Sequence, residues 1–361
     1  MSEVKMMKAL YHRAAGRPNA HIEMIPYPTC GDNDVIMKVM SCSICKWADI
    51  NHDTVGGGGT LAKYPVVTGH EFAGIVEEVG KNVTDFKPGD HITADNAIPC
   101  GHCHYCKNGK PLLCENFGSL GHNINGGYAQ YLVVTQNNVV KLPENLPFDQ
   151  ACIAEPVACA IEAIDRADIK AGENVVISGM GPHGIILAQL ATHSNAMHAL
   201  AVGLVEERLA ILREHGCETV LADRNDMSVQ EKAIREICPD GIDVIIDTSG
   251  AWNSLMSLYG MLKKGGRILQ YGAFHRAIDL PDPAGFFNEL HFKNQSWIGV
   301  SCQVHNFPRA VEYMKTGKVD VSMLVTHTFD LDDYFLALDT NKTDKSAQKV
   351  VIHPNGDPNK Q

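Results

Sequence analysis

Four cysteines lie close together in the sequence with the spacing C-x2-C-x2-C-x7-C, at Cys100, Cys103, Cys106 and Cys114. Thiolate sulfurs bind tetrahedral Zn²⁺ at about 2.3 Å, so the segments between the ligands must be short and must turn sharply. Gly101 and Pro111 are turn-forming residues within this stretch. Because four thiolates fill a tetrahedral coordination sphere, the pattern predicts a structural zinc with no open position for a substrate.

A second set of possible metal ligands lies upstream. Cys45 follows Ile44, and His70 and Glu71 are adjacent in the sequence. One thiolate, one imidazole and one carboxylate leave a fourth coordination position open, which a catalytic zinc requires. The sequence therefore predicts two zinc ions with different roles.

Composition excludes several classes of protein. Five of the twelve cysteines belong to these two sets, and the other seven are scattered without a disulfide framework, which indicates a reduced, cytoplasmic protein. The first residues carry charges where an export signal is apolar, and Glu155 and Glu162 interrupt the most apolar later stretch, so we expect no membrane partner. The net charge of −11 gives no basic footprint for nucleic acid.

The middle of the chain alternates between predicted strands and helices. Strands are expected over residues 173–179, 196–203, 219–223, 242–250, 266–273 and 294–301, with helices between them, the first over 185–192. This alternation is typical of a doubly wound parallel sheet, an α/β fold. A glycine turn follows the first strand and runs Gly179, Met180, Gly181, Pro182, His183, Gly184. Between a strand and a helix it predicts a dinucleotide site, because glycines and the helix N-terminus can approach a pyrophosphate closely.

The two ends of the chain differ from the middle. Residues 1–155 contain short Val, Ile and Thr runs between turn residues, which predicts a β-rich and mostly antiparallel domain. The tail over 302–361 has mixed character and is expected to fold back onto it. We therefore predict a catalytic domain of residues 1–155 and 302–361, with a nucleotide-binding domain of 156–301 inserted between its parts.

Several segments in this order resemble the zinc-dependent medium-chain dehydrogenase/reductase family over nearly the whole chain: ICKWAD, GHEFAGIVEEVG, KPGDHI, PCGHCHYC, NGGYAQYLVV, AEPVACAIEAIDRADI, GMGPHG and KGGRILQYG. Within the family the chain most resembles the polyol dehydrogenases of the sorbitol, threitol and erythritol type. The resemblance implies a GroES-like catalytic domain, a Rossmann domain and a homodimer or homotetramer. It also implies a small-molecule polyol or sugar substrate.

The same resemblance places the catalytic zinc on Cys45, His70 and one carboxylate. Glu71 and Glu155 both fit the third position, and the sequence does not choose between them. Glu71 could instead orient His70 or bind an arginine, and Glu155 could be an ordinary carboxylate at a helix start, before Pro156.

The loop after Cys45 departs from the family pattern, which has a hydroxyl residue two places after this cysteine. Here Lys46, Trp47 and Ala48 come between Cys45 and Asp49, so the usual proton relay is missing or rebuilt. Ser43, Asp49, His52 or a water could replace it, although we expect His52 to be an ordinary loop histidine. Trp47 could wall the substrate pocket or pack a domain interface. Lys46 could bind the pyrophosphate or be solvated.

The nucleotide-binding segment departs from the family pattern as well. Gly203 stands where an acidic residue normally binds the ribose 2′-hydroxyl, and Arg208, Arg224 and Glu206 are the nearby charged residues. The choice between NAD and NADP is therefore open, with NAD slightly favoured. His183 could contact the pyrophosphate or simply face solvent.

The predicted activity is hydride transfer between a secondary alcohol of a polyol, cyclitol or sugar derivative and a nicotinamide cofactor. Two alternatives remain. One is a sugar epimerase or lyase that retains NAD for transient oxidation, and the other is a non-catalytic scaffold. Intact Cys45, His70 and the glycine turn argue against a scaffold.

Overall fold

The computed structural model describes residues 4–54, 61–274, 277–278, 280 and 282–360. The chain divides into two compact units. The first consists of Met1–Ala158, Gln303–Thr316 and Val321–Gln361, and the second of Cys159–Cys302 and Gly317–Asp320.

The first unit is built on β-sheets, as predicted for the ends of the chain. Its largest sheet has seven strands: β3 (Asp34–Ser43), β5 (Glu71–Val79), β6 (His91–Ala94), β9 (Tyr131–Thr135), β10 (Val139–Lys141), β17 (Val325–Asp330) and β18 (Lys349–His353). Its pairings are antiparallel except for the parallel pair β17 and β18. β3 pairs with β5, β9 and β18. The C-terminal strand therefore lies directly beside the strand that leads to Cys45.

Smaller elements complete this unit. Two further sheets contain β1 (Met6–His12), β2 (Ala20–Pro26) and β4 (Val66–Val67), and β7 (Ala97–Ile98) with β8 (Gly118–Ser119). The helices are α1 (Ala48–Asp53), α2 (His104–Lys107), α3 (Phe148–Ala151), α10 (Phe307–Lys315) and α11 (Tyr334–Thr343), and α4 (Ala154–Ala167) begins in this unit and continues into the second. Short 3₁₀ turns are η1 (Arg17–Asn19), η2 (Pro111–Leu113), η3 (Gln136–Asn138), η4 (Ser322–Leu324), η5 (Leu331–Asp333) and η6 (Pro358–Lys360). Phe72, Tyr128 and Tyr334 are large buried side chains of its core.

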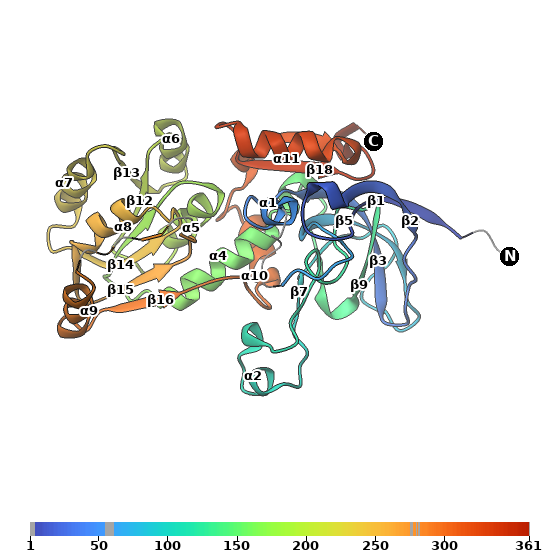
Figure 1. Cartoon of the computed structure of the whole chain (residues 1–361), viewed down its shortest axis with the longest axis horizontal. Helices are drawn as coiled ribbons and strands as arrows, with labels where there is room; N and C mark the ends of the chain where they lie inside the picture. Colours follow the sequence, from blue (N-terminus) through green and yellow to red (C-terminus); the bar gives the residue numbers. More distant parts are fainter. Residues whose placement is uncertain (1–3, 55–60, 275–276, 279, 281, 361) are drawn as a thin grey trace. The chain divides into compact units, whose positions relative to one another are not determined.

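The second unit is the predicted doubly wound parallel sheet. Six strands are hydrogen-bonded in the order β13 (Glu218–Leu221), β12 (His198–Gly203), β11 (Asn174–Ser178), β14 (Ile242–Asp247), β15 (Leu262–Gln270) and β16 (Ser296–Gly299). The helices α5 (Pro182–Thr192), α6 (Glu206–Glu214), α7 (Met227–Ile237), α8 (Trp252–Tyr259) and α9 (Pro283–Phe292) surround this sheet (Figure 1). The sheet order turns at β11, whose carboxyl end leads into the glycine turn. Open α/β sheets bind ligands at such a point.

Helix α5 begins at Pro182, three residues before the predicted start at 185. Proline is suited to a first helical turn because its missing N–H would have no partner there. Gly184 lies inside that turn, and a Cβ at this position would be 1.8 Å from the carbonyl oxygen of Gly179. The strand and the helix can therefore meet this closely only with glycine at 184.

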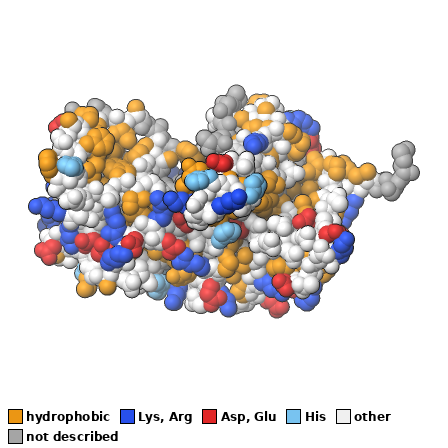
Figure 2. Space-filling view, turned by 90° about the horizontal axis from the view of Figure 1, so that it is seen from below, with side chains coloured by type: hydrophobic (Ala, Val, Ile, Leu, Met, Phe, Trp, Pro, Cys, Tyr) orange, Lys and Arg blue, Asp and Glu red, His pale blue; other side chains and the backbone are white. Residues whose placement is uncertain are grey.

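Two features of the fold bear on membrane and nucleic-acid partners. No helix among the described residues has the length and apolar character needed to cross a membrane. Figure 2 shows acidic and basic side chains interspersed on the face that it draws, without a continuous basic patch.

Candidate functional site

The cysteine lobe is the segment between β7 and β8, and it contains α2 and η2 (Figure 1). It brings together the sulfurs of four cysteines, all within 4.8 Å of one another: Cys100, Cys103, Cys106 and Cys114. Gly101 and Gly109 have φ values of 73° and 67°, which suits glycine and turns the chain sharply between the ligands. The predicted local geometry is therefore present.

The ionisation of these thiols fits a cation. Hydrogen bonds from backbone N–H groups lower the pKa of Cys103 to about 6. Burial, together with the neighbouring Cys103, raises the pKa of Cys106 to about 12. Four crowded thiols cannot all ionise without a compensating positive charge, and a tetrahedral Zn²⁺ supplies that charge. The donor set therefore fits zinc.

The second group consists of Cys45, His70 and Glu71, whose ligand atoms also lie within 4.8 Å of one another. Cys45 lies between β3 and α1, Glu71 is the first residue of β5, and His70 comes immediately before it. Gly69 precedes them with φ 91°, and a Cβ there would be 2.8 Å from the Tyr128 ring. Glycine is therefore needed for the turn that places His70 opposite Cys45.

The electrostatic environment of His70 favours positive charge. Burial alone would lower the pKa of this imidazole. The Cys45 sulfur, followed by the Glu155 and Glu71 carboxylates, outweighs burial and raises the pKa to about 10. A divalent cation would meet the same favourable field, and sulfur, nitrogen and carboxylate oxygen are donors that zinc accepts.

Glu71 has a partner that the sequence did not reveal. Lys349 on β18 donates to both carboxylate oxygens, at 2.6 and 2.5 Å, and the Ser43 hydroxyl donates to Oε2. The Lys349 side chain is 3% exposed and Glu71 is fully buried. Burial would raise the pKa of Glu71, but Lys349 and His70 hold it below its ordinary value. Glu71 is thus a buried, charge-compensated carboxylate.

Glu155 is the other candidate ligand. It lies in the first turn of α4, is buried, and contributes to the raised pKa of His70. The group within 4.8 Å contains Glu71 and not Glu155, counted over the described residues. The two carboxylates therefore differ in their surroundings. Both oxygens of Glu71 accept hydrogen bonds from Lys349, whereas Glu155 lies in the first turn of a helix.

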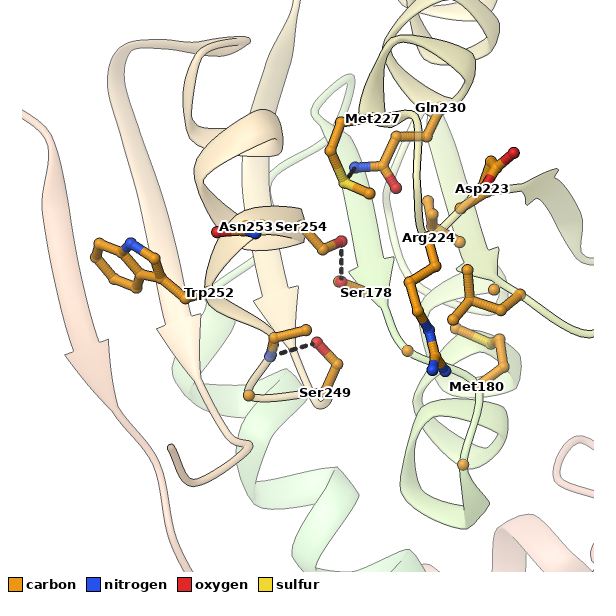
Figure 3. A pocket seen from close by; sticks show the side chains of 18 of the residues that line it. Ser178, Met180, Asp223, Arg224, Met227, Gln230, Ser249, Trp252, Asn253 and Ser254 are labelled. Carbon is orange, nitrogen blue, oxygen red and sulfur yellow. Dashed lines mark hydrogen bonds between the residues drawn. The ribbon is translucent and has the colours of Figure 1, made fainter. Parts of the chain in front are cut away.

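The second unit contains a pocket of about 1290 Å³ beside the glycine turn (Figure 3). Its lining includes Gly179, Met180 and Gly181 from the turn and Gly203 from the end of β12. Met227, Gln230, Trp252 and Ser254 line other walls, and Arg224 extends into the pocket in Figure 3. The pocket therefore includes part of the glycine turn for which the sequence predicts a dinucleotide site.

The charged side chains near Gly203 differ in whether they line the pocket. Arg208 lines the pocket and its Nη1 donates to the Met180 carbonyl at 3.1 Å. Arg224 and Asp223 also line it, whereas Glu206 forms an ion pair with Arg213. Among the described lining residues, the charges are thus two arginines and one aspartate.

The remaining predicted nucleotide residues are arranged differently. Gly184 packs inside α5, and the His183 ring contacts Tyr271 with centroids 5.2 Å apart. Neither His183 nor Pro182 is among the described residues that line the pocket, and Lys46 belongs to the first unit.

Comparison with known proteins identifies the family. Residues 31–144 match the alcohol dehydrogenase GroES-like domain, and residues 182–316 match the zinc-binding dehydrogenase model. D-arabinitol dehydrogenase 1 of Uromyces fabae is 30% identical over 332 residues, which cover 91% of this chain and 92% of the relative. The chain belongs to the zinc-binding dehydrogenase family.

Two further comparisons agree with this result. L-threonine 3-dehydrogenase of Mesorhizobium japonicum is 29% identical over 365 residues, covering 96% of this chain and 98% of that protein. A solved structure from Sinorhizobium meliloti 1021, described as a zinc-binding dehydrogenase bound to NADP, is 26% identical with a TM-score of 0.84. It covers 97% of this chain and 100% of that chain. The predicted family and the GroES-like and Rossmann folds are confirmed, and the chain is a zinc-dependent, nicotinamide-dependent oxidoreductase.

In this dehydrogenase the unusual loop after Cys45 is held from several sides. Asp49 Oδ2 accepts hydrogen bonds from the Cys45 amide at 2.8 Å and from the Tyr128 hydroxyl at 2.7 Å. Burial raises the pKa of Asp49 to about 6. Asp49 therefore holds the Cys45 loop in place. The sequence had indicated only a possible proton relay for this residue.

His52 was expected to be a loop histidine, and that expectation is wrong. It lies in α1, is 1% exposed, and its Nδ1 is 2.7 Å from the Tyr64 hydroxyl. The helix forms because Asp49 anchors its first turn and the Gly16 amide donates to the His52 carbonyl at its end. Lys46 and Trp47 precede the helix and are exposed, Trp47 by 55%.

Proposed function

We propose that this dehydrogenase oxidises a secondary hydroxyl of an acyclic polyol of the D-arabinitol class. The observation that carries the proposal is the polar composition of the first unit's metal group, where buried carboxylates accompany Cys45 and His70. The similarity to a D-arabinitol dehydrogenase supports the same substrate class. A site with buried hydrogen-bonding groups rejects a simple alcohol because those groups lose their partners.

For the catalytic zinc we propose Cys45, His70 and Glu155 as ligands. Glu71 is less suited because Lys349 occupies both of its oxygens and compensates its charge. Glu71 and Lys349 would instead hold the start of β5, and with it His70, in place. Cys100, Cys103, Cys106 and Cys114 would hold the structural zinc.

Each group in this site would have a separate role in the reaction. When bound, zinc supplies Lewis acidity that makes an alcohol proton easier to remove, and the nicotinamide supplies the hydride acceptor. Asp49 and Tyr128 hold the Cys45 amide in place. Glu155 would carry negative charge beside His70, and Trp47 would offer an exposed ring surface to the carbon face of the polyol.

We propose NADP as the preferred nucleotide, which reverses the slight preference for NAD expected from the sequence. Gly203 removes the carboxylate that would repel a 2′-phosphate, while Arg224 and Arg208 line the pocket. The similar structure that holds NADP supports this choice. In the glycine turn, the backbone of Gly179 and Gly181 would receive the pyrophosphate.

Arg224→Ala tests the nucleotide proposal, with Arg213→Ala as a matched control because Arg213 pairs with Glu206 outside the pocket lining. Loss of a hydrogen bond to a charged group costs about 1.5–3 kcal/mol, so kcat/KM for NADP should fall by about tenfold or more. The value for NAD should change by less than about twofold. Equal losses with both nucleotides would contradict the proposal.

Glu155→Ala and Glu71→Gln test the ligand assignment by zinc analysis of the purified proteins. The Glu155 variant should lose most catalytic zinc, and its kcat/KM for D-arabinitol should fall at least about tenfold, or 1.4 kcal/mol. The Glu71 variant should retain the metal. Zinc loss confined to the Glu71 variant would reverse the assignment.

Three broader proposals accompany this function. We propose the domain boundaries 1–155, 156–301 and 302–361, supported by the nearby divisions after Ala158 and Cys302. We also propose a homodimer or homotetramer, on the family resemblance. We propose a cytoplasmic location because the cysteines outside the two metal groups are scattered along the sequence without a disulfide framework.

A further inference from the structure

A group of ring side chains adjoins the candidate zinc site within the first unit. We call His12, His52, Tyr64 and His122 the histidine cluster. The His122 ring lies against His70 with centroids 4.6 Å apart, and His52 follows at 5.7 Å from His122. His12 and Tyr64 both lie 5.8 Å from His52. The rings therefore form a continuous series that begins at a candidate zinc ligand.

The cluster contains buried nitrogen atoms that lack partners. Nε2 of His52 and both ring nitrogens of His12 make no hydrogen bond to any described residue, although both side chains are 1% exposed. More than nine in ten buried polar groups in proteins are paired, to protein or to ordered molecules. These nitrogens therefore indicate a small polar molecule as partner.

The charge state of the cluster suits hydroxyl groups. Burial lowers the pKa of His12 and of His52 to about 4, so both rings are neutral near pH 7. A neutral imidazole offers one donor and one acceptor, and a hydroxyl group offers the same pair. A third metal site does not fit, because the described residues contain only two groups with ligand atoms close enough, and neither includes this cluster.

His122, like Tyr64, is only partly buried, whereas His12 and His52 are fully buried. Its Nδ1 lies 3.1 Å from the Ser119 hydroxyl, and its carbonyl accepts from the Lys63 amide at 3.1 Å. The ring is therefore fixed in orientation at the edge of the cluster nearest His70.

We propose that the histidine cluster binds the hydroxyl groups next to the reacting carbon of the polyol, with His122 as the specificity-determining residue and His52 behind it. This inference rests on the proposed polyol dehydrogenase function. It assigns the preference for polyols over simple alcohols to a set of rings contributed by β1, α1 and two loops.

His122→Phe tests the proposal in the zinc- and nucleotide-loaded enzyme, with D-arabinitol and 2-butanol as substrates. We expect kcat/KM for D-arabinitol to fall by about tenfold or more, while the value for 2-butanol changes by less than about twofold. His122→Gln, whose amide keeps a donor and an acceptor, should retain the preference within about threefold. His91→Phe is the matched control, because the His91 ring contacts the Phe148 ring outside the cluster at the same centroid distance of 4.6 Å.

A binding measurement gives a second readout. In enzyme with cobalt in place of the catalytic zinc and without nucleotide, D-arabinitol should perturb the visible absorption of the metal. His122→Phe should raise the half-saturating concentration about tenfold, and His91→Phe should leave it unchanged.

The outcomes separate the inference from the function on which it rests. Equal losses for both alcohols in His122→Phe would overturn the inference by making His122 a support for His70 only. Unchanged kinetics and binding would overturn it in favour of buried water as the partner of the cluster. If the unaltered enzyme oxidises no polyol, the proposed function fails and the inference falls with it.

Discussion

The buried ion pair of Glu71 and Lys349 allows one prediction to be worked out from its geometry. Lys349→Met keeps most of the side-chain volume but removes the ammonium that contacts both oxygens of Glu71. The carboxylate is fully buried and would keep its hydrogen bond from the Ser43 hydroxyl, which carries no charge. Removing one partner of such a pair costs about 3–5 kcal/mol, since it leaves a buried charge uncompensated.

Thermal unfolding of the zinc-saturated protein measures this loss. At about 2–4 °C per kcal/mol, the melting temperature should fall by about 6–20 °C. The double variant Lys349→Met/Glu71→Gln should recover more than half of the loss, because no uncompensated charge is left. Lys342→Met is the control: Asp53 keeps its bond to Arg17 when Lys342 is lost, so the cost should stay below about 1 kcal/mol.

The pH dependence has a defined sign. Because Lys349 and His70 hold the pKa of Glu71 below its ordinary value, the pair stabilises the fold above about pH 4, and this stabilisation is lost as the pH falls further. Lys349→Met should lose this contribution. A loss of less than about 1 kcal/mol in the single variant, or no recovery in the double variant, would refute the reasoning.

Three further predictions concern the metal sites, a buried histidine and the nucleotide pocket. Cys103→Ser should lower the yield of folded protein and its zinc content, because a structural zinc contributes folding free energy. Cys45→Ser should remain folded but have no activity. Equal yields of the two variants as soluble protein would contradict this. Folding holds the pKa of His12 near 4, whereas in the unfolded chain the ring protonates below about pH 6.5, so the unaltered protein loses stability as the pH falls from 7.5 to 5. His12→Phe should make this loss smaller by about 2 kcal/mol. Identical dependence of the urea-unfolding free energy on pH in the two proteins would contradict this. Gly203→Asp should shift the nucleotide preference towards NAD. It should also lower stability, because the new Cβ would lie 2.7 Å from Met180 Cγ. An unchanged ratio of the kcat/KM values for NADP and NAD would show that position 203 does not set the nucleotide preference.

The sequence predicted most reliably what short segments determine. The four-cysteine cluster is encoded within one short segment, so its spacing alone predicted a site whose sulfurs converge. The glycine turn and the alternating strands likewise predicted the parallel sheet and its pocket. In these cases the residues that form a feature are neighbours in the chain or repeat with a regular period.

Contacts between distant segments were not predictable in the same way. Lys349 reaches Glu71 because β18 pairs with β3, which in turn pairs with β5, and no local pattern reports this register. Tyr128 meets Asp49 for a similar reason, across two separate segments. His52 looked like a loop residue because its helix has only six residues. Hydrogen bonds from Tyr128 and Gly16, which are distant in the sequence, stabilise its two ends.

The histidine cluster shows the same limit. His12, His52 and His122 lie far apart in the sequence, and each alone is most simply interpreted as a surface or core histidine. Only the packing of β1, α1 and the segment after β8 brings their rings together beside His70. The buried nitrogens without partners are visible only in the folded chain.

Release of reduced nicotinamide during polyol oxidation tests the central claim most directly. The zinc-loaded enzyme should be mixed with NADP or NAD and with D-arabinitol, other polyols, L-threonine or 2-butanol, while the absorbance of the reduced nucleotide is followed. We expect reduced nucleotide to accumulate in solution, one equivalent for each ketose formed, with at least one polyol and with little response to 2-butanol. A polyol converted without release of reduced nucleotide, or a zinc- and nucleotide-loaded enzyme that favours L-threonine or 2-butanol over every polyol, would contradict the account.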